Sequence, residues 1–214
     1  MQTVRYSEDV IFWAERLTEH CYFLYELLNE KALSLKQEAA RQYKEWQAML
    51  AKTDYNRLAL LLPKLKALKL EIRKLLMNNE FIGTIELSLI NHMLEELEHL
   101  QKLMNDKVSA DDIIEFYLNH ASEVAALSAH RLDPSEKSLT MEALEMADHL
   151  FSAALDPHDY PDALDLYADS NAMAEDLLKG LEDKSVHASL TPMMVKHEIL
   201  EAQFGQRKLD LLLQ

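Results

Sequence analysis

Long stretches without turn residues decide the fold, and the clearest spans residues 85–105, which read IELSLINHMLEELEHLQKLMN. This stretch has neither glycine nor proline and consists mostly of good helix formers such as leucine, glutamate and methionine. The whole chain of 214 residues has three glycines and five prolines. That is too few for the frequent turns of a β-sandwich or an α/β sheet. The sequence therefore predicts an all-α fold.

Eight helices are predicted from capping residues and from prolines, which lack the amide hydrogen that a helix interior needs. They span about residues 7–30, 32–51, 53–77, 82–105, 109–132 and 134–155, then from a turn at 156–161 to 181, and from 191 onward. Because Pro63 falls inside the third of these segments, we expect that helix to be kinked or broken there.

The chain resembles itself when it is shifted by 104 residues, or by 105 after one loop. The matched residues are Phe12-Trp13 with Phe116-Tyr117, Glu19 with Glu123, His92 with His197 and Glu96 with Glu201. We therefore predict an internal duplication, with repeats at 1–108 and 109–214 packed around one core. The first, fourth, fifth and eighth helices are expected to form that core.

A set of glutamates and histidines recurs in both copies and predicts a metal site. The set is Glu19, His92, Glu96, Glu123, His197 and Glu201. In each His-x-x-x-Glu pair, the two residues share one helix face because they are four apart. Carboxylates neutralise divalent cations and imidazoles add a nitrogen ligand, and di-iron and di-manganese bundles use this inventory. We expect a divalent transition metal, iron or manganese, with zinc also compatible.

The order of the pair leaves alternatives open, because such bundles use Glu-x-x-His rather than His-x-x-x-Glu. The site can hold one metal or two, or be asymmetric. Further candidates for it are His20, Glu26, His99 and His130, although each is explained as well by an ordinary core or solvated position. The favoured function is metal binding, with di-iron or di-manganese redox chemistry as an option, and the competing function is a non-catalytic helical interaction module without a functional metal. No catalytic residue or substrate is predicted.

Charge and composition exclude several partners. The net charge of −15 repels phosphate backbones, so nucleic acid is not expected. No apolar run approaches the ~20 residues that span a bilayer, and charged residues near the N-terminus argue against a signal peptide. We expect a cytoplasmic protein without a membrane partner, and a homo-oligomer stays open.

Two lesser features are given structural explanations. The single cysteine, Cys21, stands among aromatic residues and is expected to be buried and inert. A basic stripe on the third helix is expected to be a solvated face. It comprises Lys64, Lys66, Lys69, Arg73 and Lys74.

The repeat starts resemble a bacterial ferritin-like family of unknown function, domain-of-unknown-function family 2935. The similar segments are Phe12-Trp13 followed by Glu19-His20, and Phe116-Tyr117 followed by Glu123 and Leu132-Asp133-Pro134. The His-x-x-x-Glu pairs resemble the family's later motif, and the resemblance covers nearly the whole chain. It implies a ferritin-like helical bundle that holds iron or manganese, with no known reaction. The sequence departs from the pattern at Val124, where a second histidine is expected, and at Leu28-Asn29-Glu30. A fully symmetric site is therefore not expected.

Overall fold

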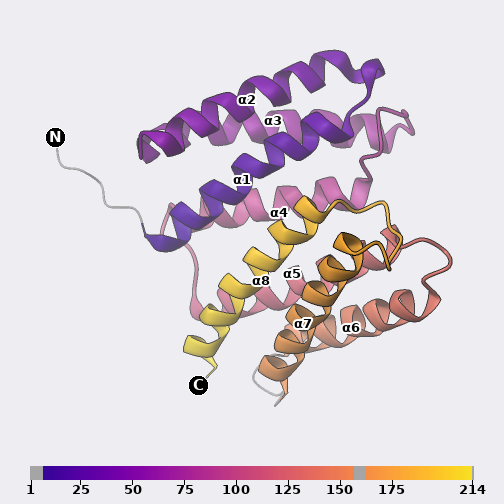
Figure 1. Ribbon diagram of the computed structural model, residues 1–214. Coiled ribbons are helices and arrows are strands. Elements are labelled where there is room, and N and C mark those ends of the chain that lie inside the picture. The colour runs from indigo at the N-terminus through magenta and orange to yellow at the C-terminus, as the bar shows by residue number, and fades with distance from the viewer. Residues whose placement is uncertain (1–6, 157–161, 214) are drawn as a thin grey trace. The chain divides into compact units, whose positions relative to one another are not determined.

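The computed structural model describes residues 7–156 and 162–213, and within these ranges it contains eight α-helices and no strand (Figure 1). The all-α prediction is therefore confirmed. The predicted turn at 156–161 falls mainly on residues 157–161, which lie outside the described residues. None of the helices in the described part is long and apolar enough to cross a membrane.

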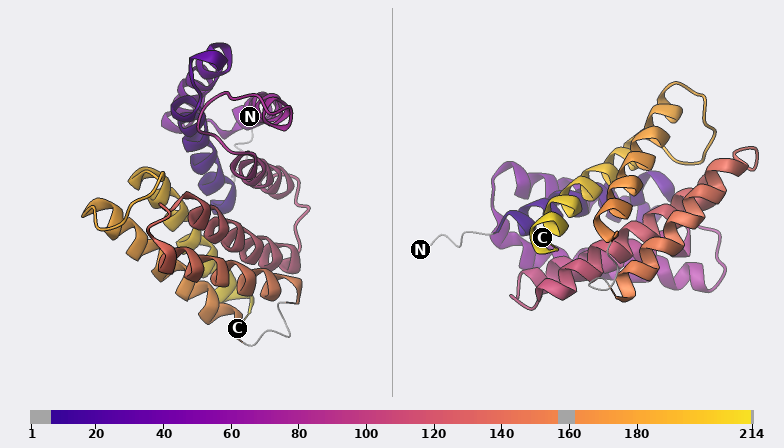
Figure 2. Two further views of the ribbon diagram at one scale, coloured as in Figure 1. Left: turned by 90° about the vertical axis from the view of Figure 1, so that its right-hand side faces the viewer. Right: turned by 90° about the horizontal axis from the view of Figure 1, so that it is seen from below.

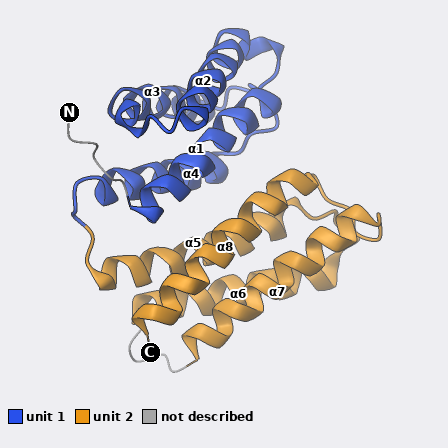
Figure 3. Ribbon diagram, turned by 60° about the vertical axis from the view of Figure 1, so that its left-hand side comes forward, with its two compact units in different colours: residues 1–107 blue, residues 108–214 orange. Residues whose placement is uncertain are grey.

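The chain divides into two compact units, residues 1–107 and 108–214 (Figure 3). The assignment of repeats to residues 1–108 and 109–214 stays a prediction. Among the described residues, each unit has four α-helices that run alongside one another (Figure 2). The prediction that the first, fourth, fifth and eighth helices share one core stays a prediction.

Unit 1 is a bundle of four helices, α1 (Glu8–Leu27), α2 (Leu33–Ala51), α3 (Leu58–Met77) and α4 (Leu87–Leu103). Short 3-10 turns, Glu30–Ala32 and Tyr55–Arg57, precede α2 and α3. Helix α1 packs against α2 and α4, and α3 packs against the same two helices. Apolar side chains from all four helices fill the core, and they include Trp13, Leu17, Trp46, Leu65 and Leu97.

Unit 2 repeats this plan with α5 (Ala110–Arg131), α6 (Lys137–Leu155), α7 (Ala163–Glu182) and α8 (Pro192–Leu212). Helix α5 packs against α6 and α8, and α7 packs against α6 and α8. Its core includes Tyr117, Leu118, Leu150, Tyr167 and Phe204. In both units the first and last helices are neighbours, and these two helices carry the predicted metal ligands.

Side-chain caps set three of the predicted helix starts. Ser7 accepts a hydrogen bond from the amide of Val10, and Thr191 accepts one from Met194. Ser109 and Asp112 form a reciprocal capping box at the start of α5. Each cap satisfies an amide that has no partner within its own helix, which explains why these helices begin where they do.

The same backbone connection ties the end of the first helix to the loop before the last helix in each unit. In unit 1, the amide of Asn29 donates to the carbonyl of Ile82 and the amide of Thr84 donates to Leu27, at 2.8 and 3.0 Å. In unit 2, Asp133 donates to His187 and Ser189 donates to Arg131, both at 2.8 Å. The bridges formed in this way join Leu28 to Gly83 and Leu132 to Ala188.

Of the kink or break expected at Pro63, the break does not occur, because α3 runs without interruption from Leu58 to Met77. Pro63 lies in the second turn of the helix, so its missing amide and its ring affect only the carbonyl of Ala59, close to the helix start. The chain can adjust there without ending the helix.

Candidate metal centre

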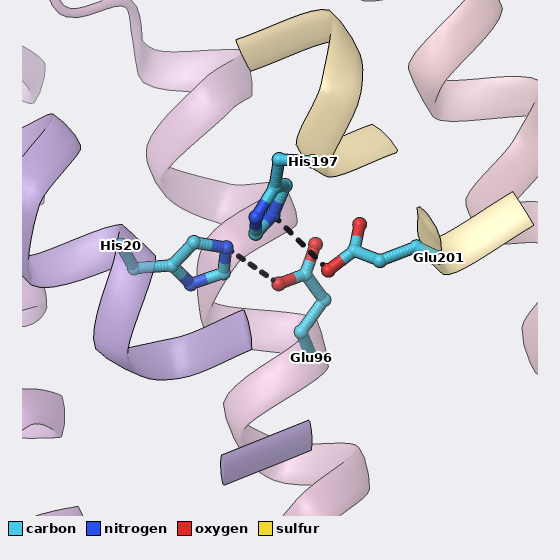
Figure 4. Close-up of side chains that lie close together, drawn as sticks. All are labelled: His20, Glu96, His197 and Glu201. Atoms are coloured by element: carbon cyan, nitrogen blue, oxygen red, sulfur yellow. Dashed lines mark ion pairs between the residues drawn. The ribbon is translucent and has the colours of Figure 1, made fainter. Parts of the chain in front are cut away.

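In unit 1, α1 and α4 bring two histidines to one buried carboxylate. Glu96 has 0% of its surface exposed, and His20 and His92 are buried beside it. Nε2 of His20 lies 2.9 Å from Oε2 of Glu96, and Nε2 of His92 lies 2.9 Å from Oε1. Figure 4 shows the pair of His20 and Glu96. The sequence predicts His92 and Glu96 as ligands, and the structure places His20 beside Glu96; metal binding by these residues stays a prediction.

Lys69 stands behind His20 and corrects the expectation of a solvated basic stripe. Its side chain is fully buried, and Nζ lies 3.0 Å from Nδ1 of His20. The same amine donates a hydrogen bond to the carbonyl of Met93 on α4. Lys69 thus holds the His20 ring with Nε2 directed at Glu96. Lys64 and Lys66, by contrast, are partly exposed and pair with Glu45 and Glu98.

Unit 2 builds a corresponding group from α5 and α8. Glu201 is 1% exposed, and His120 and His197 are buried beside it. Nε2 of His120 lies 3.3 Å from Oε2 of Glu201, and Nε2 of His197 lies 3.1 Å from Oε1. Figure 4 shows the pair of His197 and Glu201. Each unit therefore presents one buried glutamate between two imidazoles.

Glu198 extends the group in unit 2. One ligand atom from each of His120, Glu198 and Glu201 lies within 4.8 Å of the others. Glu198 and Glu201 are three apart on α8, so they lie on neighbouring positions of one helix face. Unit 2 by itself therefore offers two imidazoles and two carboxylates.

The distances and the chemistry of these donors fit a divalent transition metal. Two ligand atoms that each lie about 2.1 Å from one ion are separated by roughly 3.0 Å at a right angle and by roughly 3.4 Å at the tetrahedral angle. The nitrogen–oxygen distances of 2.9 to 3.3 Å match this range. A buried carboxylate also requires a compensating cation or proton.

Two predicted ligands, Glu19 and Glu123, lie on the first helices of their units and are only half-buried. Glu19 forms an ion pair with Arg16, in which Nη1 lies 3.1 Å from Oε2. The role of both glutamates in metal binding stays a prediction.

The four further candidate ligands differ in burial and in what they contact. Glu26 and His130 are exposed, and Nδ1 of His130 lies 2.7 Å from the carbonyl of Ala126 on its own helix. His99 is buried with its ring edge-to-face against Trp13, at 5.5 Å between centroids. Of the four candidates, His20 is the one that the structure places against Glu96.

Sequence reasoning missed His120 and Glu198. In the repeat alignment His120 falls on Arg16, and Val124 falls on His20, so no histidine matches another on the first helices. A signal was nevertheless present, because His120 precedes Val124 by four residues and so lies on the same helix stripe. Glu198 follows His197 directly and gave no periodic signal.

An apolar cavity of about 160 Å³ lies within unit 2, and His120 and Glu198 form part of its wall. Tyr167 also lines the cavity and is fully buried. Burial raises the pKa of Tyr167 far above its ordinary value of 10.0, and the nearby charge of Glu201 raises it further. The phenol therefore stays protonated beside the candidate ligands.

No family model matches the chain. The chain is 24% identical to an uncharacterized protein of Acanthamoeba polyphaga mimivirus over 169 residues, which is 66% of this chain and 52% of that protein. The chain thus spans about half the length of this curated relative. Its structure is similar to the crystal structure of an uncharacterized protein from Bacillus cereus G9241, with a TM-score of 0.80 and 19% sequence identity. That match covers 95% of this chain and 88% of the other, and it shows that the two proteins share a helical fold.

Proposed function

We propose that the protein binds divalent transition metal, iron or manganese, through the glutamate and histidine groups of its two units. The observation that carries the proposal is the recurrence in both units of a fully buried glutamate between two imidazoles. Glu19 and Glu123 remain within the proposal as additional carboxylates on the same helices.

Charge balance supports a metal in these groups. An ionised carboxylate taken out of water is costly unless a cation or several hydrogen bonds compensate it. Two neutral imidazoles supply nitrogen lone pairs but no positive charge. A divalent cation bound to the carboxylate and a neighbouring imidazole would supply the missing positive charge.

The ligand set favours chemistry at the metal as well as binding. Imidazole and carboxylate ligands are the types that non-haem iron(II) oxygenases use, and in unit 2 His120, Glu198 and Glu201 supply both types. When bound, such a metal supplies Lewis acidity and one-electron chemistry. The cavity beside His120 and Glu198 gives unit 2 a place for a reactant. We therefore extend the proposal to a redox function in unit 2.

A second function is favoured by Lys69 and concerns unit 1. Its buried amine reaches His20, so a protonated Lys69 supplies a fixed positive charge within the group that contains Glu96. In that case the polar residues around Glu96 only stabilise the fold, and unit 1 is a helical module without a functional metal. Metal content measured separately for the two groups decides between these functions.

The direct test is metal analysis of the full chain purified without a histidine tag. We expect bound iron or manganese, and a rise in melting temperature when either metal is added to chelator-treated protein. Neither bound metal nor a thermal shift with iron, manganese or zinc would contradict the proposal. Oxygen consumption after anaerobic loading with iron(II) tests the redox function, and its absence would leave metal binding alone.

We include in the same proposal that the chain is related to the ferritin-like family of unknown function, which the starts of its repeats resemble. The helical fold shared with the Bacillus cereus protein is compatible with it.

A further inference from the structure

The cavity in unit 2 has walls that are mainly apolar. It is enclosed by residues from all four helices of the unit and from the loop before α8. The apolar part of the wall includes Val124, Ala125, Ala143, Ala174, Leu177 and Val186. At about 160 Å³, it is close to the size of an engineered cavity of about 150 Å³ in another protein that binds benzene. Such a space accommodates one small ring or a short branched chain.

A few polar side chains interrupt the apolar wall, and Tyr167 is the most deeply buried of them. Its exposed fraction is 0%, and among the residues that the structure describes its hydroxyl has no hydrogen-bond partner. Ser170 and His120 also line the cavity and are buried. A buried hydroxyl without a partner is costly, so a ligand that provides a partner gains that hydrogen bond on binding.

Charge restricts the ligand further. The cavity wall includes three acidic residues, Glu142, Asp176 and Glu198, and Glu201 lies close to Tyr167. Glu142 and Asp176 are exposed and screened by water, but Glu198 is half-buried and Glu201 is buried, so an anion entering this space would meet like charges that water screens less. Carboxylates and phosphates are therefore poor ligands for the metal-free protein.

We propose that this cavity is a binding site for a small, uncharged, mostly apolar molecule that carries one hydroxyl or carbonyl group. The apolar part fills the space among α5, α6 and α7, and the polar group hydrogen-bonds to Tyr167. The ligand site stands on the cavity alone. If His120 and Glu198 bind a metal, such a molecule is also the substrate of that metal, and this part rests on the proposed function.

The test uses the full chain after chelator treatment, with fluorinated aromatic probes followed by ¹⁹F NMR at neutral pH. The probes are fluorobenzene, 4-fluorophenol and 4-fluorobenzoate. We expect fluorobenzene and 4-fluorophenol to bind, the phenol about fivefold more tightly because of one net hydrogen bond. We expect 4-fluorobenzoate to bind at least roughly tenfold more weakly than the phenol, because of the acidic residues.

Substitutions in the cavity wall test whether the probes bind in this cavity. Ala143→Leu fills the space and should weaken both neutral probes about tenfold or more, whereas Ala172→Leu, at an exposed position of α7, should leave them unchanged. Tyr167→Phe should remove the preference for 4-fluorophenol and retain fluorobenzene. If Ala143→Leu does not fold, judged by circular dichroism, Val124→Phe fills the same cavity from a half-buried position.

The outcomes separate this site from the metal proposal. Failure of both neutral probes to bind, or unchanged binding in every folded filling variant, overturns the ligand site. Probe binding by a chain that holds no metal as purified and takes up no added iron, manganese or zinc supports the ligand site and overturns the proposed function alone. Metal binding by a chain that binds neither neutral probe supports the proposed function and overturns the ligand site.

Discussion

His20 and His120 lie against equivalent buried glutamates, although the two histidines are one helical turn apart in the alignment of the repeats. Nε2 of His20 is 2.9 Å from Glu96, and Nε2 of His120 is 3.3 Å from Glu201. The alignment pairs His120 with Arg16 and His20 with Val124. Because residues four apart share a helix face, either turn of the first helix can place an imidazole near the carboxylate.

The first prediction concerns the separate metal content of the two units. Glu96→Gln keeps the shape of the side chain but removes its charge, so we expect it to lose the metal of unit 1 only. Glu201→Gln should likewise lose the metal of unit 2 only. Metal analysis by mass spectrometry measures both, with Glu98→Gln, on the exposed side of α4, as the matched control. If either single variant removes all bound metal, the two centres are not independent, which is what one centre built from both repeats predicts.

The second prediction concerns Lys69. Lys69→Met keeps an unbranched buried chain but removes the amine, so Nδ1 of His20 and the carbonyl of Met93 lose a contact. We expect unfolding free energy to fall by about 1–3 kcal/mol, measured by denaturant titration. Lys66→Met removes a partly exposed ion pair with Glu98 and should cost no more than about 1 kcal/mol. Equal effects of the two variants would argue against a buried role for Lys69.

The third prediction concerns the close approach of Tyr167 to α8. A Cβ added at Gly205 would lie 2.1 Å from the Tyr167 hydroxyl oxygen and 2.6 Å from Cδ1 of Tyr117. Gly205→Ala should therefore destabilise unit 2 by about 1–3 kcal/mol, despite the better helix propensity of alanine. Thermal melting of Gly205→Ala, Tyr167→Phe and the double variant measures the coupling. The double variant should recover part of the loss, and purely additive effects would contradict the predicted clash.

The fourth prediction compares equivalent positions of the two backbone connections, which join the end of the first helix to the loop before the last helix in each unit. Gly83 has φ of +152°, and a Cβ there would lie 2.0 Å from the carbonyl oxygen of Leu27. Gly83→Ala should destabilise unit 1 by more than about 1 kcal/mol. The equivalent residue of unit 2 is Ala188, which already carries a Cβ, so Ala188→Gly is the matched exchange and should have a smaller effect. Similar losses from both exchanges, in denaturant titrations, would show that the glycine is not required.

The fifth prediction concerns Cys21 and pH. Burial raises the pKa of the Cys21 thiol from its ordinary value of 9.0 to about 12. The native thiol should react with a disulfide reagent at pH 8 far more slowly than the same thiol in denaturant. Because the folded pKa is the higher one, the stability linked to this group is fully present below pH 9 and is lost as pH rises toward 12. Cys21→Ala should remove that part of the loss, and rapid native labelling would contradict the prediction.

The sequence predicted what local geometry determines. Periodicity and caps identify the eight helices, and a four-residue spacing places His92 beside Glu96 and His197 beside Glu201 because each pair lies on one helix. The partners from the neighbouring helices were harder to identify. Whether His120 or Glu123 of α5 faces Glu201 depends on the rotation of α5 about its axis, and packing of the whole unit determines that rotation. Lys69 was assigned to a solvated stripe because its charge was considered without its neighbours on α1 and α4.

The backbone connections affect how far the length of the segment between the first and last helix of a unit can vary. In unit 1, the hydrogen bonds of Asn29 and Thr84 join the two ends of the segment that contains α2 and α3. The entropic cost of closing such a loop rises only slowly with its length. Insertions or deletions at exposed positions between these hydrogen bonds would therefore leave the neighbouring helices α1 and α4, which carry His20 and Glu96, joined at the same points. The intervening hairpin can diverge as a variable module while the register of His20 and Glu96 persists.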